Sequence, residues 1–211
     1  IVGHLGDMVY DAKSDKIYAS LEYKNDAIGK GITQKLGIEG NQQDGFYIAV
    51  FDASRINDTD LSAEDDKLLK TVYLKEVVDD YLATVTNNGK EYKHRFACSG
   101  IDGITLAPPI GKPNSKKRYL YVAYGVYGDT TRTDNDHQVI LKYDIANWDK
   151  MGSTLYQNEL HQSGPKKPKS KYFVMTGNTT YGIQNLAYDA HNGNLYAAVY
   201  KGKKSKYPNY S

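Results

Sequence analysis

Cysteine is almost missing from this sequence, with Cys98 alone among 211 residues. A single cysteine cannot form an intramolecular disulfide, which excludes the disulfide framework of a small secreted scaffold. Long apolar runs are missing as well, so we expect no membrane span. Charge of one sign is not in excess, because 27 Lys and Arg stand against 25 Asp and Glu. A net charge of +2 spread along the chain argues against a nucleic-acid partner.

The remaining composition is that of a folded globular chain, with 40% hydrophobic and 25% charged residues. Its length corresponds to one large domain or two small ones. The sequence begins at Ile1 without a methionine or a basic and apolar leader. We therefore expect either a removed targeting segment or, preferably, a piece of a longer protein. We expect an extracellular or cell-surface location and leave a cytoplasmic one open.

Tyrosine dominates the aromatic residues, with 20 Tyr against 4 Phe and 1 Trp. Tyrosine suits a pleated, half-buried surface. Helical periodicity is scarce and is confined to residues 61–81, whereas short apolar runs between Gly, Asn, Asp and Ser recur throughout. This pattern predicts an antiparallel all-β protein.

An internal repeat is the strongest pattern in the chain. Residues 7–21 align without a gap on residues 185–199 and share Tyr-Asp-Ala and a later Tyr-Ala. Each copy has the form strand, tight turn, strand, and its turn is rich in Asp, Asn, Ser and Gly. A third copy begins at residues 100–106 and returns at 119–124 after a proline-containing connection.

Further strands are predicted after the hairpins. Residues 46–55 resemble residues 138–147, each with an aromatic residue followed by Asp before a turn. Candidate fourth strands are residues 67–75 and 153–161. Four antiparallel strands per repeat indicate β-propeller blades. A two-sheet sandwich with accidental similarity is the alternative fold.

On this interpretation residues 1–211 form a partial β-propeller of about two and a half blades. Blade one spans about 4–90, blade two about 91–172, and the first hairpin of blade three about 173–211. Known propellers close with about 4 to 8 blades. We therefore expect the remaining blades to come from missing sequence or from another chain.

Two long polar insertions, residues 25–44 and 128–136, follow the second strand of blades one and two. Strand parity places both on one face with the entry to the first strand, so we expect a binding rim there. The first strands also begin with groups able to face a shared channel. These are His4, Asp7, Asp102, Gln184 and Asn185. Oxygen ligands from several blades suit calcium, or such groups can simply satisfy nearby backbone N–H groups.

The hairpins with Gly-Ile-x-x-Leu and Leu-Tyr-Ala-Ala at residues 182–198 resemble those of the calcium-containing propeller hydrolases. These are the lactonase and phosphotriesterase group and the propeller phytases. The resemblance implies acidic and amide calcium ligands from the inner strands, which map onto Asp7, Asp102 and Asn185. Many propellers of other functions share the same hairpins.

Two functions therefore stay open. The first is a ligand-binding protein whose tyrosine-rich, long-looped face holds a small polar ligand such as a carbohydrate or a peptide. The second is a calcium-dependent hydrolase of an ester, lactone or phosphate, with His4 as catalytic base and Asp7, Asp102, Gln184 and Asn185 as metal ligands. Binding is the preferred interpretation because no catalytic motif is present.

Overall fold

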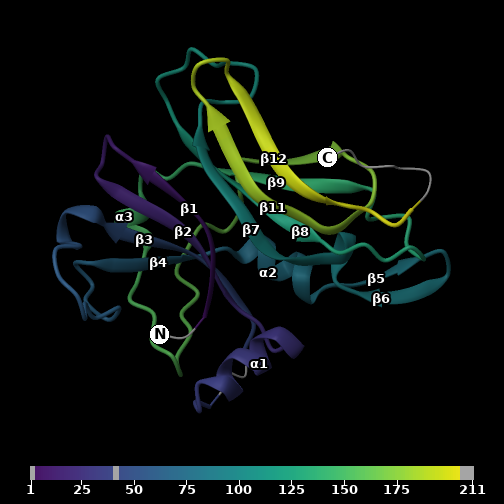
Figure 1. Ribbon diagram of the computed structural model, residues 1–211, viewed down its shortest axis with the longest axis horizontal. Helices are drawn as coiled ribbons and strands as arrows, with labels where there is room; N and C mark the ends of the chain where they lie inside the picture. Colours follow the sequence, from purple (N-terminus) through teal and green to yellow (C-terminus); the bar gives the residue numbers. More distant parts are fainter. Residues whose placement is uncertain (1–2, 40–42, 205–211) are drawn as a thin grey trace. The chain divides into compact units, whose positions relative to one another are not determined.

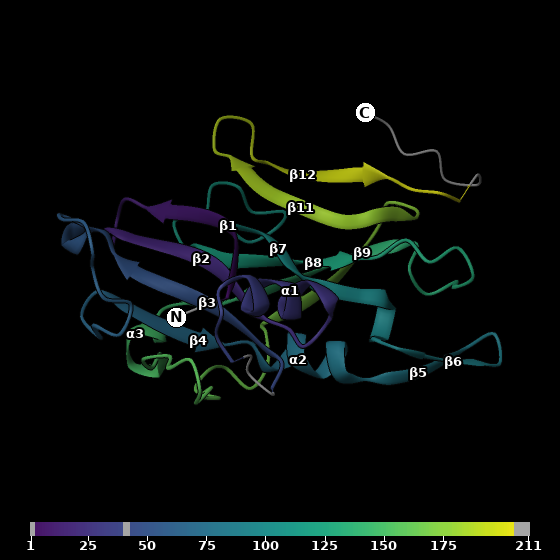
Figure 2. The ribbon, with the colours of Figure 1, turned by 60° about the horizontal axis from the view of Figure 1, so that its bottom comes forward.

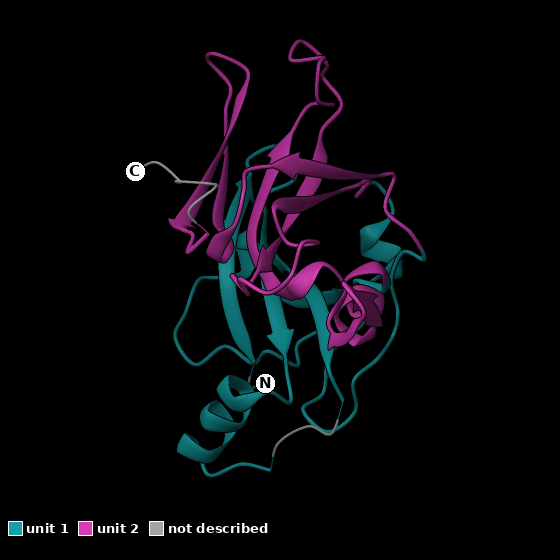
Figure 3. Cartoon of the chain, turned by 90° about the vertical axis from the view of Figure 1, so that its right-hand side faces the viewer, with its two compact units in different colours: residues 1–75, 146–166 teal, residues 76–145, 167–211 magenta. Residues whose placement is uncertain are grey.

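The computed structural model describes residues 3–39 and 43–204 and divides into two compact units. Unit 1 comprises Ile1–Lys75 and Ala146–Lys166, and unit 2 comprises Glu76–Ile145 and Lys167–Ser211 (Figure 3). Both units are built from antiparallel sheets, so the predicted all-β class is confirmed. Within the described residues, no helix has the length and apolar character needed to cross a membrane.

Unit 1 contains one four-stranded sheet in which neighbours in sequence are neighbours in space. Its strands are β1 (His4–Asp11), β2 (Lys16–Tyr23), β3 (Gly45–Asp52) and β4 (Leu69–Tyr73) (Figure 1). The helices are α1 (Ala27–Lys35), between β2 and β3, and the single-turn α3 (Trp148–Met151). β3 is buried without alternation from Gly45 to Val50, as expected for a central strand covered on both faces.

Unit 2 contains a second four-stranded sheet of the same up-and-down order and two separate hairpins. The sheet consists of β7 (Cys98–Ala107), β8 (Tyr119–Val126), β9 (His137–Tyr143) and β10 (Ser170–Met175). The hairpins are β5 (Thr84–Asn87) with β6 (Lys90–Lys93), and β11 (Thr179–Asp189) with β12 (Asn194–Lys201) (Figure 2). Helix α2 (Lys75–Leu82) precedes β5.

The repeated segments form the strands that the sequence predicts for them. Residues 7–21 belong to β1 and β2, and residues 185–199 belong to β11 and β12. The poorer copy forms β7 and β8. The expected third strands are β3 and β9, and residues 67–75 include β4. The blade boundaries drawn above stay predictions, and residues 205–211 of the third blade lie outside the described residues.

The predicted fourth strand at residues 153–161 is wrong. The strand that pairs with β9 is β10, which begins at Ser170. Residues 153–161 belong to unit 1, where Ser153 forms an isolated antiparallel bridge with Thr71 of β4. Residues 165–169, just before β10, are proline and lysine and have the composition of an exposed linker. This composition hides the start of the strand from sequence analysis.

His161 fixes the segment Ala146–Lys166 to the sheet of unit 1. Its Nε2 lies 2.7 Å from Thr71 Oγ1, and its Nδ1 accepts the Ser163 N–H at 3.1 Å. The Tyr47 hydroxyl donates to the His161 carbonyl oxygen at 2.7 Å. The Ser163 bond requires an unprotonated Nδ1, so the neutral ring with its proton on Nε2 fits this environment. Burial lowers the pKa of His161 below its ordinary value of 6.5, although the Ser153 carbonyl opposes the shift.

Acidification is therefore expected to destabilise the protein through His161. Its folded pKa is lower than its unfolded pKa, so the unfolded chain binds more protons as the pH falls below about 6.5. The free energy of unfolding should decrease by at most about 1.4 kcal/mol per pH unit from this group. Urea titrations on both sides of that pH should show a smaller decrease for His161→Gln than for the wild type. An unchanged decrease in His161→Gln, with His191→Gln as the exposed control, would contradict the assignment.

The β11–β12 hairpin packs on β7 and β8 of its own unit through glycines. Gly182 has a φ of +77°, and a Cβ there would lie 2.2 Å from the Val126 nitrogen. A Cβ on Gly103 of β7 would lie 2.9 Å from an Ile183 methyl group. Backbones can approach this closely only where no side chain intervenes. The Gly-Ile pattern at residues 182–183 therefore serves close contact between the hairpin and the sheet.

Candidate functional site

The insertion between β2 and β3, predicted as part of a binding rim, is a closed loop that carries α1. Its base is tied by the Asn25 N–H, which donates to Asp44 Oδ1 at 2.7 Å. Asp26 caps α1 by accepting the Gly29 N–H at 2.9 Å. Residues 40–42 of this insertion lie outside the described residues. The insertion is thus held at both its base and its helix start.

Gly29 sets how closely α1 can approach the strand that precedes it. A Cβ on Gly29 would lie 1.7 Å from the Lys24 carbonyl oxygen, so no larger residue fits. Two residues on, a Cβ on Gly31 would meet nothing within 4 Å. The two glycines therefore differ in function although they share a helix, because only Gly29 is required by packing.

A pocket lies where this insertion meets the start of β1 and the end of β2, and we call it the rim pocket. Its volume is about 50 Å³, enough for a few water molecules or one small polar group. Its lining includes Gly3, His4, Glu22, Tyr23, Lys24, Asn25, Ile28, Gly29, Ile32 and Gln157. His4, predicted to face a central channel, and the insertion, predicted as a rim, both line this pocket of unit 1.

The rim pocket combines a buried carboxylate with basic groups. The Glu22 side chain is 1% exposed, and Lys24 Nζ lies 2.9 Å from its Oε2. His4 Nδ1 lies 3.7 Å from the same oxygen, and its side chain is about half exposed. Ile28 and Ile32 of α1 form an apolar part of the pocket wall. The pocket can thus offer an acceptor, a donor and an apolar surface to one ligand group.

The second predicted rim, residues 128–136, is organised around a buried cation. Arg132 is fully buried and forms a two-pronged ion pair with Asp134, with both N···O distances 2.7 Å. Its remaining N–H groups donate to the Lys93 and His94 carbonyl oxygens and to the Tyr127 hydroxyl at 2.9–3.1 Å. All five guanidinium donors are therefore used within unit 2.

A second cation completes the same loop. Lys204 Nζ donates to the Arg132 carbonyl oxygen, to Asn135 Oδ1 and to Asp136 Oδ1, at 2.5–2.8 Å. Asp134 and Asp136 are thus paired with cations of their own unit. The loop carries an internal ion-pair network, and its acidic residues are engaged in holding its shape.

The predicted calcium ligands are divided between the two units. His4 and Asp7 lie on β1 of unit 1, whereas Asp102, Gln184 and Asn185 lie on β7 and β11 of unit 2. The structure brings two of them together, because Gln184 Nε2 donates to Asp102 Oδ2 at 3.2 Å. Carboxylate and amide oxygens of this kind are ligands that calcium accepts, so the residues fit the ion chemically.

The first strand of every repeat is irregular at the predicted positions. The pairing of β7 shifts between Ile101 and Gly103, which leaves Asp102 as the extra residue. β11 shifts between Ile183 and Asn185, which leaves Gln184 extra. β1 shifts between Leu5 and Met8, around Asp7. β-bulges re-aim side chains and are frequent beside functional sites.

Much of the tyrosine that suggested a binding face lies in the interior. Eight tyrosines are buried among the described residues: Tyr18, Tyr23, Tyr47, Tyr73, Tyr81, Tyr121, Tyr124 and Tyr143. Tyr121, for example, donates to the Pro108 carbonyl oxygen at 3.0 Å and accepts the Ile110 N–H at 3.1 Å. Burial raises the pKa of Tyr121 to about 12, so its hydroxyl stays protonated at neutral pH.

Sequence reasoning missed Glu22, Lys24 and Arg132. Glu22 and Lys24 lie at and just after the end of β2, whose sequence shows no pattern that would mark a site. They line a pocket only together with α1, which follows them in the chain. One feature of the sequence could have indicated the role of Arg132, since it is the single arginine in a loop that also holds Asp129, Asp134 and Asp136. No family model, curated protein or solved structure matches this chain.

Proposed function

We propose that the protein binds a carbohydrate at the rim pocket of unit 1. The observation that carries this proposal is the buried Glu22 carboxylate beside Lys24 in a hollow of about 50 Å³. Such a hollow takes one small group of a larger ligand whose remainder lies across the exposed Ile28 of α1.

A hydroxyl group matches the chemistry of the rim pocket better than a charged group. One hydroxyl can donate to the Glu22 carboxylate and accept from the Lys24 ammonium at the same time. A ligand ammonium would compete with Lys24 for the same carboxylate, and a ligand carboxylate would meet Glu22. These considerations favour neutral sugars over peptides within the class of polar ligands.

The proposal includes the β-propeller architecture expected from the repeat. Support comes from two four-stranded up-and-down sheets, from a third hairpin of the same type, and from bulges at equivalent places in all three first strands. In this arrangement the remaining blades come from sequence beyond this chain or from another chain.

Calorimetric titration with a panel of neutral oligosaccharides tests the binding function. We expect saturable binding of at least one sugar by the wild type. Gly29→Ala should abolish it, because the added methyl group displaces α1 from the Lys24 carbonyl oxygen. Circular dichroism checks that the sheet of this variant stays folded.

Gly31→Ala is the matched control for this experiment. It lies on the same helix in open space and should bind the sugar as the wild type does, while gaining up to about 1 kcal/mol of helix stability. Wild-type protein that binds no sugar in the panel would contradict the proposal, as would equal binding by Gly29→Ala. Binding only of peptides would assign the pocket to the other class of polar ligand.

A calcium-dependent hydrolase is the second candidate, and the bulges at Asp102 and Gln184 of unit 2 favour it. Calcium held by Asp102, Gln184 and Asn185 would polarise an ester, lactone or phosphate oxygen. Asp7 as a further ligand and His4 as the base stay predictions from the sequence, because both lie on β1 of unit 1. Calcium titration of the wild type and of Asp102→Ala tests this candidate. We expect binding heat that the substitution diminishes, and no heat in the wild type would rule the calcium site out.

A further inference from the structure

A second and larger cavity lies in unit 1 at the end of the sheet where β2 begins and β3 ends. Its volume is about 300 Å³, at the lower end of the range of about 300–1,000 Å³ typical of small-molecule sites. Val50, Leu68, Leu69 and Trp148 provide its apolar lining and are all at least nine-tenths buried. We call it the Trp148 cavity. It shares no lining residue with the rim pocket.

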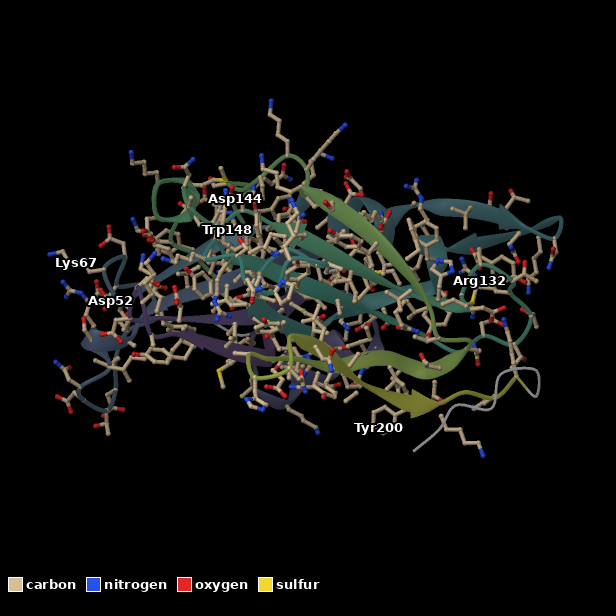
Figure 4. The ribbon with its side chains drawn as sticks, turned by 90° about the horizontal axis from the view of Figure 1, so that it is seen from above. Asp52, Lys67, Arg132, Asp144, Trp148 and Tyr200 are labelled. Atoms are coloured by element: carbon tan, nitrogen blue, oxygen red, sulfur yellow. The ribbon has the colours of Figure 1, made fainter. Side chains whose placement is uncertain are left out.

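Strand register explains why these groups meet. Lys16 pairs with Asp52, Tyr18 with Val50, and Val50 with Lys70, so these side chains share one face of the sheet. Trp148, labelled in Figure 4, lines the same cavity as Val50 and Lys70. Its ring lies 6.5 Å from the ring of Tyr18.

The segment that carries Trp148 is fixed to the neighbouring strand. Ser153 and Thr71 exchange two backbone hydrogen bonds of 2.9 and 3.0 Å. Gly152 lies against Lys70, where a Cβ would come within 3.1 Å of the Lys70 Cβ. The cavity wall is therefore attached to the sheet at two adjacent residues.

Several charged groups of the cavity are already paired. Lys16 forms an ion pair with Asp149. Asp52 accepts hydrogen bonds from the Ser54 hydroxyl and N–H at 2.6 and 3.1 Å, and the Ser54 bonds lower the pKa of Asp52. Both pairs lie within unit 1.

The other charged groups of the lining are Lys67, Lys70 and the exposed Asp66. Among the described residues, Lys67 Nζ has no ion-pair partner, and Lys70 Nζ reaches only the Asp149 carbonyl oxygen at 3.4 Å. The two ammonium groups of Lys67 and Lys70 therefore outnumber the single carboxylate of Asp66 among the charged groups that are not in the pairs above. They lie beside an apolar and aromatic lining.

We propose that the Trp148 cavity binds a small organic carboxylate with a planar apolar body. The carboxylate lies between the ammonium groups of Lys67 and Lys70, which donate charge-assisted hydrogen bonds. The apolar body of the ligand contacts the accessible edges of Val50, Leu68 and Trp148, and removal of the ligand's own apolar surface from water favours binding. Inorganic phosphate can accept from the lysines but has no apolar body to place against this lining.

Tryptophan fluorescence reports on this site directly, because Trp148 is the only tryptophan of the chain. Benzoate is the probe, benzamide is its neutral counterpart, and inorganic phosphate is the anion without an apolar body. With excitation selective for tryptophan, we expect a saturable change with benzoate and none with benzamide. Phosphate should require at least about tenfold higher concentration.

Lys67→Gln and Lys70→Gln test the role of the lysines. Each should weaken benzoate binding by about tenfold, the effect of one charge-assisted hydrogen bond. Lys67 is exposed, and its ammonium has no ion-pair partner within residues 3–39 and 43–204, so Lys67→Gln alone keeps the test valid if Lys70→Gln fails to fold. Lys166→Gln removes the same charge from an exposed position outside the cavity and should bind as the wild type does.

Four results would overturn the proposal. These are no saturable change with benzoate, equal responses to benzoate and benzamide, equal affinity for phosphate and benzoate, and unchanged affinity in Lys67→Gln. The sugar titrations of the rim pocket use other residues and another probe, so failure of either proposal leaves the other standing.

Discussion

Arg132→Ala is expected to lower the free energy of unfolding by about 3–5 kcal/mol, the cost of breaking a buried ion pair by removing one partner. The guanidinium is fully buried, and its loss leaves Asp134 and the Lys93 and His94 carbonyl oxygens without their donors. The Tyr92 ring also loses the cation stacked 4.7 Å from its centre. Urea unfolding followed by circular dichroism measures the loss as a lower midpoint at unchanged slope.

Two further arginine variants separate this network from a general effect of charge. Arg132→Lys keeps the charge but not the five-donor fork, so it should recover only part of the stability. Arg55→Ala removes an exposed arginine whose nitrogen lies 3.7 Å from Asp52, and it should change stability by no more than about 0.5 kcal/mol. A loss in Arg132→Ala no greater than that in Arg55→Ala would show that the buried network is not stabilising.

Gly182→Ala is expected to destabilise unit 2 by about 2–5 kcal/mol. The left-handed backbone of Gly182 costs about 1–2 kcal/mol for alanine. The methyl group also meets the Val126 nitrogen at 2.2 Å, and such overpacking costs about 1–3 kcal/mol. Because the contacting atoms are backbone, β11 must move away from β8, and hydrogen exchange should show faster exchange in both strands.

Gly89→Ala isolates the conformational part of this effect. Gly89 has a φ of +74° but nothing within 4 Å of the added methyl group. It should therefore cost only about 1–2 kcal/mol. Equal losses in the two variants would mean that the close approach of Gly182 to β8 contributes nothing.

The repeated hairpins were predictable because their chemistry is local. The Tyr-Asp-Ala turns at residues 10–12 and 188–190 fix both the strand ends and the turn within a few residues. β10 was not predictable, because its exposed Phe173, Val174 and Met175 lack the alternation of a half-buried strand. A local pattern cannot show that residues 146–166 return to the first sheet.

The candidate site was predictable only where one strand and its own insertion make it. His4 and residues 25–44 follow from strand parity, since both belong to one end of the same sheet. The pocket at Glu22 also needs α1, and the approach of α1 to Lys24 depends on the absent side chain of Gly29. Trp148 and Val50 line one cavity although about a hundred residues of chain separate them, and a single sequence carries no signal for that proximity.

The discontinuity of unit 1 constrains how the protein can be made and divided. Trp148 and His161 follow residues 76–145 of unit 2 in the chain. During synthesis, the four strands of the first sheet are therefore complete about seventy residues before the segment that packs on them is made. A gene fragment that stops at residue 145 lacks these two anchors. Any effort to express the first sheet alone should therefore join residues 1–75 to residues 146–166 by a short designed connector.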